Sequence, residues 1–300
     1  MEFHAGNSKQ HTSKVQLGVS GGKLYKWVME KQKLYCYTNG RFQKIATAYG
    51  TYGTIHDGHF YYASLAYKLC SYHLESGVHR KLGDLGFYHA ADCYAVDDAA
   101  LAFPTDSERS SYYRLIDGTI AEDTSTHEAY TFGEYTYQLE GDMNLKTLIR
   151  YDQDGKSTEY ESELHNVDMV VFPCSNGLVV TTGADGKKLY YINGASGEII
   201  ELFSLDCLGT ETTLNIHKDT VYLSVLCYVE HGSLTWKSDP EDVRNGTYCI
   251  SLSDYRIEKI SDEVYSGLFI FDDSGIYACK DIGDVYKLDF NGNVLLALSE

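Results

Sequence analysis

Aromatic residues in polar segments are the feature of this sequence best suited to recognition chemistry. The longest such segment, "HGSLTWKSDPEDVRNG" at residues 231–246, contains Trp236. An aromatic side chain on a polar loop can stack on a sugar or anchor a protein partner, and loops of this length are often functional. The alternative is that Trp236 folds back and holds its own loop, and the residues alone leave both possibilities open.

Aromatic residues also recur just before several of the predicted strands. They are Tyr49 and Tyr52 in "YGTYG", Phe87, Tyr88 and His89 in "GFYHA", Tyr130 in "EAYTF", and Tyr265 in "EVYSG". Because loops on a rigid scaffold commonly carry function, we predict one ligand-binding face. Its residues are Trp236, Tyr52, Tyr88, His89, Tyr130 and Tyr265. Any one of these tyrosines taken alone is better explained by packing, since the chain has 27 Tyr.

The usual motifs of metal and hydrolase chemistry are missing from the sequence. Eight cysteines show no C-x-x-C spacing, and His56 and His59 in "HDGH" have no third ligand nearby. Neither a G-x-S-x-G nor a P-loop occurs. "DQDGK" at 152–156 is better explained as an Asp-Gly hairpin turn than as a calcium loop. We therefore expect no cofactor, no metal and no catalytic residue.

Three cysteines share one position in the predicted strands, and one asparagine begins a glycosylation sequon. Cys36, Cys70 and Cys249 occupy the same position in equivalent predicted strands, which is typical of a small apolar side chain in a sheet. "NGT" at 245–247 is a glycosylation sequon whose use depends on the host.

The charge and hydropathy of the chain limit its partners. The net charge is −18 with Lys and Arg scattered along the chain, which argues against nucleic acid or anionic lipid as partner. A cationic partner fits this charge, as does simple solubility. No run approaches the roughly 18 to 20 apolar residues of a membrane span, and residues 1–30 lack the apolar core of a secretory signal. Residues 1–12 are polar, and we expect a flexible arm or a leader there.

The elements that position these residues follow from a repeated pattern. Seven reversals, each containing Gly, Asn or Asp, precede apolar strands: "SGGK", "HDGH", "VDDA", "TFGE", "SNGL", "HKDT" and "DSGI". They begin at residues 20, 56, 96, 131, 175, 217 and 273. After each come a second and a third strand, a further turn and a fourth strand, and "KKLYYINGASGEIIEL" at 187–202 contains the third and fourth strands of the fifth unit. Such a phrase predicts a hairpin, because β-branched and aromatic residues flank a Gly-rich turn.

Seven units of four antiparallel strands predict an all-β chain and a β-propeller with seven four-stranded blades over residues 13–300. Six or eight blades are the alternatives, because the turn at "TFGE" is weak. The first unit starts with its own first strand, "KVQLGVS", and the last ends on its own fourth, "NVLLALSE". We therefore expect no blade built from both chain ends, and closure by packing between blades, helped by residues 1–12.

The phrases "LIRYDQDGKSTEY" and "VYKLDFNGNVLLAL" resemble bacterial propellers related to the low-density-lipoprotein-receptor type. The Tyr-Trp-Thr-Asp tetrapeptide of that family is absent, and its positions read "YKWV", "YYAS" and "AFPT". The resemblance implies an extracellular or cell-surface binding protein and no catalytic residue. It also implies six blades, which differs from the seven units above.

We predict a non-enzymatic binding module that recognises a glycan, a peptide or a protein partner, possibly cationic, on the loop face. A propeller enzyme, a glycosidase or lyase with carboxylates in a central pocket, is the first alternative. A purely structural module is the second. Unpaired cysteines in strands would fit a reducing cytoplasm as the alternative location.

Overall fold

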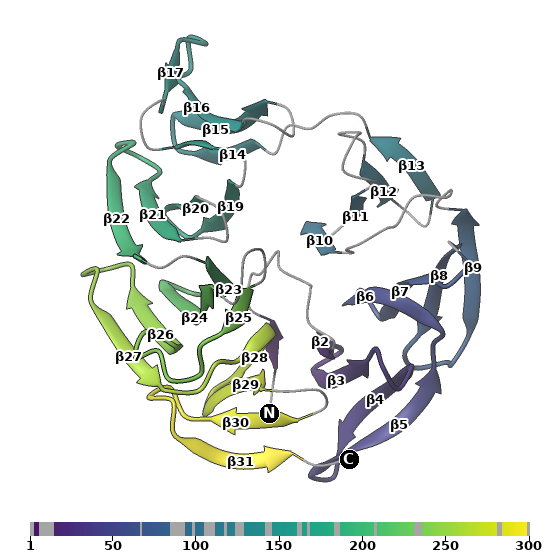
Figure 1. Ribbon diagram of the computed structural model, residues 1–300. Coiled ribbons are helices and arrows are strands. Elements are labelled where there is room, and N and C mark those ends of the chain that lie inside the picture. Colours follow the sequence, from purple (N-terminus) through teal and green to yellow (C-terminus); the bar gives the residue numbers. More distant parts are fainter. Residues whose placement is uncertain are drawn as a thin grey trace. The chain divides into compact units, whose positions relative to one another are not determined.

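A computed structural model describes residues 3–5, 15–66, 68–84, 94–97, 100–104, 112–116, 119–123, 129–141, 146–160, 164–166, 169–182, 187–206, 209–230, 236–280 and 284–298. The elements in these ranges are β-strands (Figure 1). They form seven antiparallel sheets, and in each the four principal strands are neighbours in chain order. The chain divides into two compact units, residues 1–125 with 265–300, and residues 126–264.

The first unit contains four sheets. The first sheet has β2 (Val15–Ser20), β3 (Lys23–Val28), β4 (Lys33–Thr38) and β5 (Arg41–Thr47). The second has β6 (Gly50–His56), β7 (His59–Ser64), β8 (Lys68–His73) and β9 (His79–Asp84). The third has β10 (Tyr94–Asp97), β11 (Ala100–Pro104), β12 (Tyr112–Ile116) and β13 (Thr119–Asp123). The last has β28 (Ser266–Asp272), β29 (Gly275–Cys279), β30 (Val285–Leu288) and β31 (Val294–Leu298), with β1 (His4–Ala5) added beside β28.

The second unit contains three sheets. One has β14 (Ala129–Phe132), β15 (Tyr135–Gly141), β16 (Lys146–Tyr151) and β17 (Ser157–Glu159), with β18 (His165–Asn166) also paired to β16. The next has β19 (Val170–Cys174), β20 (Gly177–Thr182), β21 (Lys188–Asn193) and β22 (Ile199–Ser204). The third has β23 (Gly209–His217), β24 (Thr220–Glu230), β26 (Gly246–Ser251) and β27 (Ile257–Ser261), with β25 (Trp236–Ser238) paired to β24.

Local sequence explains where these strands begin and end. All seven predicted reversals fall between the first and second strand of a sheet, and the phrase at 187–202 forms β21 and β22 as predicted. Second strands are rich in β-branched and aromatic residues, and β20 is buried along its whole length. Fourth strands such as β5 and β27 are mostly exposed and carry charged residues. Burial thus falls from the second strand to the fourth within these sheets.

Within the first unit, the first strands of successive sheets lie next to one another. β2 contacts both β28 and β6, and β6 contacts β10. Gly18 allows the close approach of β2 to β6, because a Cβ at that position would lie 2.6 Å from the Cβ of Ile55. Apolar side chains fill the space between the last sheet and the first, including Leu17, Phe42 and Val285. A second cluster around Trp27, Phe60 and Tyr62 fills the space between the first sheet and the next.

The two chain ends meet within this unit. β2 to β5 and β28 to β31 each form a complete four-stranded sheet, as predicted. The expectation that no sheet combines both ends was wrong, because His4 and Ala5 pair with Phe271 and Ile270 of β28. Phe3 is buried beside Tyr277, with the ring centroids 5.3 Å apart. Residues 1–2 and 6–12, the rest of the predicted arm, lie outside the described residues.

Two apolar clusters connect the sheets of the second unit. One joins the β14–β17 sheet to the β19–β22 sheet around Tyr137, Leu148 and Val180. The other joins the β19–β22 sheet to the β23–β27 sheet around Phe172, Leu214 and Val225. Repeated four-stranded antiparallel sheets in chain order, packed face to face by apolar side chains, are the architecture of a β-propeller. The predicted fold class is therefore confirmed.

Candidate functional site

The insertion predicted between the second and third strands of the sixth unit is present and largely ordered. β24 pairs with β26 only over Thr220–Val225 and continues to Glu230, where it pairs with β25. Trp236 begins β25 directly opposite Glu230. The backbone at residue 236 is therefore part of a short hairpin, and nothing is described of the Trp236 side chain. Residues 231–235 lie outside the described residues.

Residues 239–245 return the chain from β25 to β26 through a network of hydrogen bonds. The Asp239 amide donates to the Cys227 carbonyl at 3.0 Å, and the Cys227 amide donates to Asn245 Oδ1 at 2.7 Å. Tyr248 Oη donates to the Arg244 carbonyl at 2.7 Å. Because β24 and β26 are fixed by the sheet, these bonds hold the segment between them in one conformation.

An ion pair strengthens the same turn. Arg244 Nη2 lies 2.5 Å from Asp242 Oδ2, and Arg244 Nε lies 2.9 Å from Asp242 Oδ1. The hydrogen bonds from Arg244 lower the pKa of Asp242 to about 2. Arg244 Nη1 also donates to the Asp206 carbonyl, on the connection that leads into β23. Val243 in this turn is 85% exposed, and the contacts of Arg244 with Asp242 and Asp206 hold the turn in place.

The glycosylation sequon at 245–247 is buried in this network. Asn245 is 7% exposed, and its Nδ2 donates to the Asp239 carbonyl at 2.5 Å while its Oδ1 accepts from Cys227. Thr247 Oγ1 donates to the Glu263 carbonyl and lies 2.8 Å from Ser224 Oγ. Asn245 therefore has a structural role in the folded chain, and its amide nitrogen is not accessible to a glycosylating enzyme.

The six predicted ligand-binding residues occupy different environments. Tyr265 is 1% exposed and contacts the ring of Tyr286, so it contributes packing in the first unit. Tyr130 lies on β14 opposite Tyr137 and packs against the core of the second unit. The backbone of Tyr52 lies in an irregular part of β6, between the pairs formed by Gly50 and Gly53, and nothing is described of its side chain. Tyr88 and His89 lie outside the described residues.

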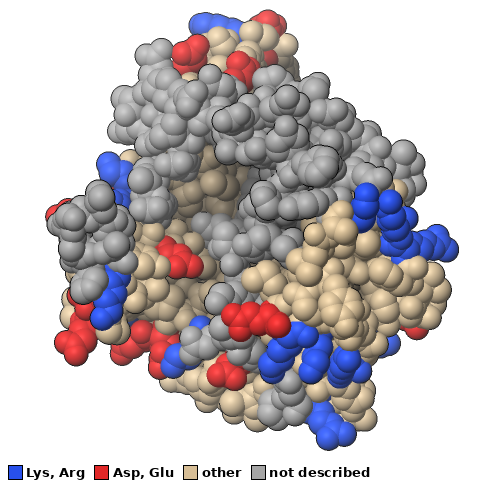
Figure 2. All heavy atoms as spheres, turned by 45° about the vertical axis from the view of Figure 1, so that its right-hand side comes forward, with Lys and Arg blue, Asp and Glu red and all other residues tan. Residues whose placement is uncertain are grey.

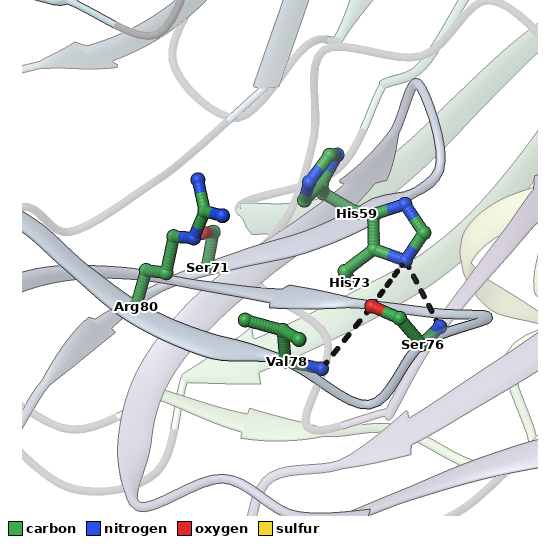
Figure 3. A pocket seen from close by; sticks show the side chains of 6 residues that line it. All are labelled: His59, Ser71, His73, Ser76, Val78 and Arg80. Atoms are coloured by element: carbon green, nitrogen blue, oxygen red, sulfur yellow. Dashed lines mark hydrogen bonds between the residues drawn. The ribbon is translucent and has the colours of Figure 1, made fainter.

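A cavity that sequence reasoning missed lies on the second sheet of the first unit. It encloses roughly 350 Å³ and is lined by His59, Ser71, His73, Ser76, Val78 and Arg80, from β7, β8, the following turn and β9 (Figure 3). The rings of His59 and His73 meet edge to face, with centroids 4.7 Å apart. Ser76 donates from its amide to His73 Nδ1 at 3.0 Å. The sequence signal that could have located this cavity is His59 in "HDGH".

The part of the chain that contains this cavity carries a local excess of positive charge. Residues 15–84 contain nine Lys and Arg but only four Asp and Glu, although the whole chain has a net charge of −18. Lys and Arg are therefore scattered along the chain as a whole but outnumber Asp and Glu within residues 15–84. Figure 2 shows groups of Lys and Arg side chains on the described surface in its right-hand part.

The described cysteines are free, and four of the six are buried. Burial raises the pKa of the Cys174 thiol to about 11 and that of Cys279 to about 12. Cys36, Cys70 and Cys249 each lie opposite a tyrosine of the second strand, namely Tyr25, Tyr62 and Tyr222. Their shared position in the third strand is therefore a repeated packing position, as predicted.

The "DQDGK" motif forms a turn, and no metal-binding cluster accompanies it in the described ranges. Asp152 Oδ1 accepts from the amides of Asp154 and Lys156, at 3.0 and 2.8 Å, in the turn between β16 and β17. Within the described part of the chain, no three His, Cys, Asp or Glu side chains are grouped so as to hold a metal ion. The same residues include no helix long and apolar enough to cross a membrane.

Comparisons with known proteins find solved structures that resemble this chain but no family to which it belongs. No protein-family model matches the chain, and no curated protein does. A computationally designed protein, Ika8, is 10% identical with a TM-score of 0.46, over 96% of this chain and 97% of its own. BamB from Moraxella catarrhalis is 10% identical with a TM-score of 0.41, over 95% and 84%. The tricorn protease is 12% identical with a TM-score of 0.31, over 91% of this chain and 33% of its own.

These likenesses are too weak to carry an argument about function. No family match accompanies the sequence resemblance to low-density-lipoprotein-receptor-type propellers. The assignment to the β-propeller class rests on strand order and pairing.

Proposed function

We propose that the protein is a non-enzymatic binding module whose contact element is the braced segment 236–245 of the β23–β27 sheet. The observation that carries the proposal is the exposure of Val243 on a turn held by Asn245, Arg244 and Tyr248. A blade does not need such an extension for its own stability. A segment that is rigid before binding loses little conformational entropy on contact, which favours recognition.

A protein or peptide partner fits this element better than a glycan does. Val243 is 85% exposed and Val229, on the extended part of β24, is 41% exposed. Exposed aliphatic side chains on an ordered projection gain free energy when a partner removes them from water. Trp236, at the start of β25, adds an aromatic residue to the same projection. A glycan stacked on Trp236 is the second ligand class.

The described carboxylates do not favour the enzymatic alternative. A general acid requires a carboxyl group with a raised pKa. The pKa values of Asp242, Asp254, Asp272 and Asp289 are instead lowered, in turns where their oxygens accept hydrogen bonds from neighbouring side chains and amides. These carboxylates act as structural acceptors.

We further propose that the seven sheets close into a seven-bladed propeller related to bacterial propellers of the low-density-lipoprotein-receptor type. The four-strand repeat and the contacts from β28 through β2 and β6 to β10 support the closure. The sequence resemblance supports an extracellular or cell-surface location. The free cysteines of the described strands support the cytoplasmic alternative.

A binding screen on peptide and glycan arrays tests the proposed function. Wild type is compared with a Trp236→Ala, Val243→Asp double variant and with Leu65→Asp as control, because Leu65 is 66% exposed on a turn of the first unit. We expect peptide ligands bound by wild type and Leu65→Asp to be lost in the double variant, with unchanged unfolding temperatures. Equal binding by all three proteins would rule out this element as the contact site.

A further inference from the structure

The residues that line the cavity on the second sheet lie on one face of it. His59 is paired with His73 across β7 and β8, and Ser71 is paired with Arg80 across β8 and β9. Residues opposite each other in an antiparallel sheet point to the same side, and so do residues two apart along a strand. The other face carries Phe60, Tyr62 and Cys70, which pack on the first sheet. The polar set is therefore separated from that core by the thickness of the sheet.

Hydrogen bonds determine which atoms of the two imidazoles can act as donors. The Ser76 amide donates to His73 Nδ1 at 3.0 Å, so this nitrogen has no proton and His73 Nε2 carries the N–H. In Figure 3 the Nε2 edge points away from the Ser76 turn. His59 Nδ1 lies 2.8 Å from the Asp57 carbonyl, which only accepts, so His59 Nδ1 carries a proton.

Ser71 and Arg80 offer hydrogen-bond donors at the same cavity. Ser71 is 3% exposed and lines the cavity. The Arg80 guanidinium has no ion pair or hydrogen bond with the described residues. A hydroxyl and a guanidinium on adjacent strands can both donate to one acceptor placed between them.

The surrounding charge favours an anion at this position. The cavity lies within residues 15–84, where Lys and Arg outnumber Asp and Glu by nine to four. The lining residues that the structure describes include an arginine, two histidines and two serines, and none of these described residues is a carboxylate. A local positive potential attracts an anionic ligand and raises its association rate.

We propose that this cavity binds a small oxyanion, the phosphate or carboxylate group of a ligand. Arg80 on β9 holds two oxygens of the group, while the Ser71 hydroxyl and His73 Nε2–H donate to it from β8. The His59 ring packs edge to face against His73 beside this donor. A volume of roughly 350 Å³ accommodates the anionic group together with a small-molecule body. The site is separate from the segment 236–245 and goes beyond the function proposed for that segment.

Calorimetric titration of the full-length protein with inorganic phosphate, at constant ionic strength, tests the proposal. We expect saturable binding by wild type that is weakened about ten-fold by Arg80→Gln and several-fold by Ser71→Ala, in line with the loss of charge-assisted and neutral hydrogen bonds. Arg41→Gln is the matched control, because Arg41 is an exposed arginine on β5 of the neighbouring sheet. It should bind phosphate as wild type does.

Acetate and methyl phosphate form the second arm of the same experiment. Binding of methyl phosphate but not acetate would assign the site to phosphate esters, and the reverse would assign it to carboxylates. Histidine ring signals in NMR spectra should shift on binding in wild type and in Arg41→Gln. The proposal is overturned if wild type shows no saturable binding of any of the three anions at about 10 mM, a concentration that detects even millimolar affinity. Equal weakening by Arg41→Gln and Arg80→Gln would also overturn it.

Discussion

At the scale of single residues, the carboxylate of Asp272 is held by four hydrogen bonds. It is 1% exposed and accepts hydrogen bonds at 2.8 Å from Lys287 Nζ, Tyr277 Oη, and the amide and hydroxyl of Ser274. Burial alone would raise its pKa, but the hydrogen bonds from Lys287, Ser274 and Tyr277 outweigh burial and lower it to about 2. Asp272 therefore stabilises the turn between β28 and β29 as an anion.

We predict that Asp272→Asn lowers the free energy of unfolding by about 3 kcal/mol at pH 7, because Lys287 is left buried without its counter-ion. The pKa of Asp272 is lowered on folding, so its contribution is complete above the ordinary value of 3.8 and is lost as the pH falls toward 2. The difference between wild type and variant, measured by urea unfolding, should therefore shrink between pH 4 and pH 2.

A double-mutant cycle with Lys287→Met provides the control. Removing both charges replaces the pair with neutral groups, so the double variant should be more stable than the sum of the two single effects predicts. Additive effects would mean that the two side chains do not interact in solution.

Asn245 provides a second residue-scale prediction. Because both ends of its amide are used inside the fold, we expect the sequon at 245–247 to be unmodified when the protein is expressed in a glycosylating host. Asn245→Ala should cost about 1 to 3 kcal/mol, since the Cys227 amide loses a buried partner. Intact mass and thermal unfolding measure the two effects. A glycan found at Asn245 on native protein would contradict the described conformation.

At the scale of the elements, β31 differs from the other outer strands. β5 and β27 carry charged residues, which protect a sheet edge, whereas β31 exposes Val294, Leu295 and Leu296 at 53%, 54% and 48%. β31 is short and pairs irregularly with β30, and both features limit pairing of its free edge with another chain. We predict that Leu296→Lys reduces aggregation during refolding, measured by light scattering, and leaves the unfolding temperature nearly unchanged. An unchanged aggregation rate would mean that another segment nucleates association.

β1 is a second element with a testable role. Phe3 is 8% exposed and packs against Tyr277, while His4 and Ala5 extend the last sheet. We predict that Phe3→Ala lowers the free energy of unfolding by about 3 kcal/mol, the usual cost of removing a buried aromatic ring. His4→Ala is the control, because His4 is exposed on the same strand. Equal stability of Phe3→Ala and wild type would show that β1 is detached in solution.

At the scale of the whole molecule, the net charge of −18 opposes compactness, since like charges repel. The local excess of cations in residues 15–84 offsets this repulsion only in part. We predict that the unfolding temperature rises as sodium chloride increases from about 10 to 200 mM, because the Debye length shortens from about 30 Å to less than 10 Å. Scanning calorimetry measures this dependence, with sodium sulfate at equal ionic strength as a comparison. A fall in the unfolding temperature with added sodium chloride would show that attractive ion pairs outweigh the net repulsion.

The sequence by itself determined the strands, the turns and the fold class. Alternating apolar residues and Gly- or Asp-containing reversals act over a few residues, so all seven reversals and the hairpin at 187–202 could be predicted. It also located the insertion before β26 and the packing role of Cys36, Cys70 and Cys249. These features depend on local propensity and on period, which are visible in the order of the residues.

Only the tertiary structure decided which side chains share a surface. Contacts between residues that are distant in sequence bury Tyr265, join Asn245 to the Cys227 amide and pair β1 with β28. The cavity likewise joins His59 to Arg80 across three strands, and the motif "HDGH" that contains His59 does not indicate which residues of β8 and β9 lie beside it. Strand register and packing between sheets bring such residues together, and no local pattern encodes those contacts.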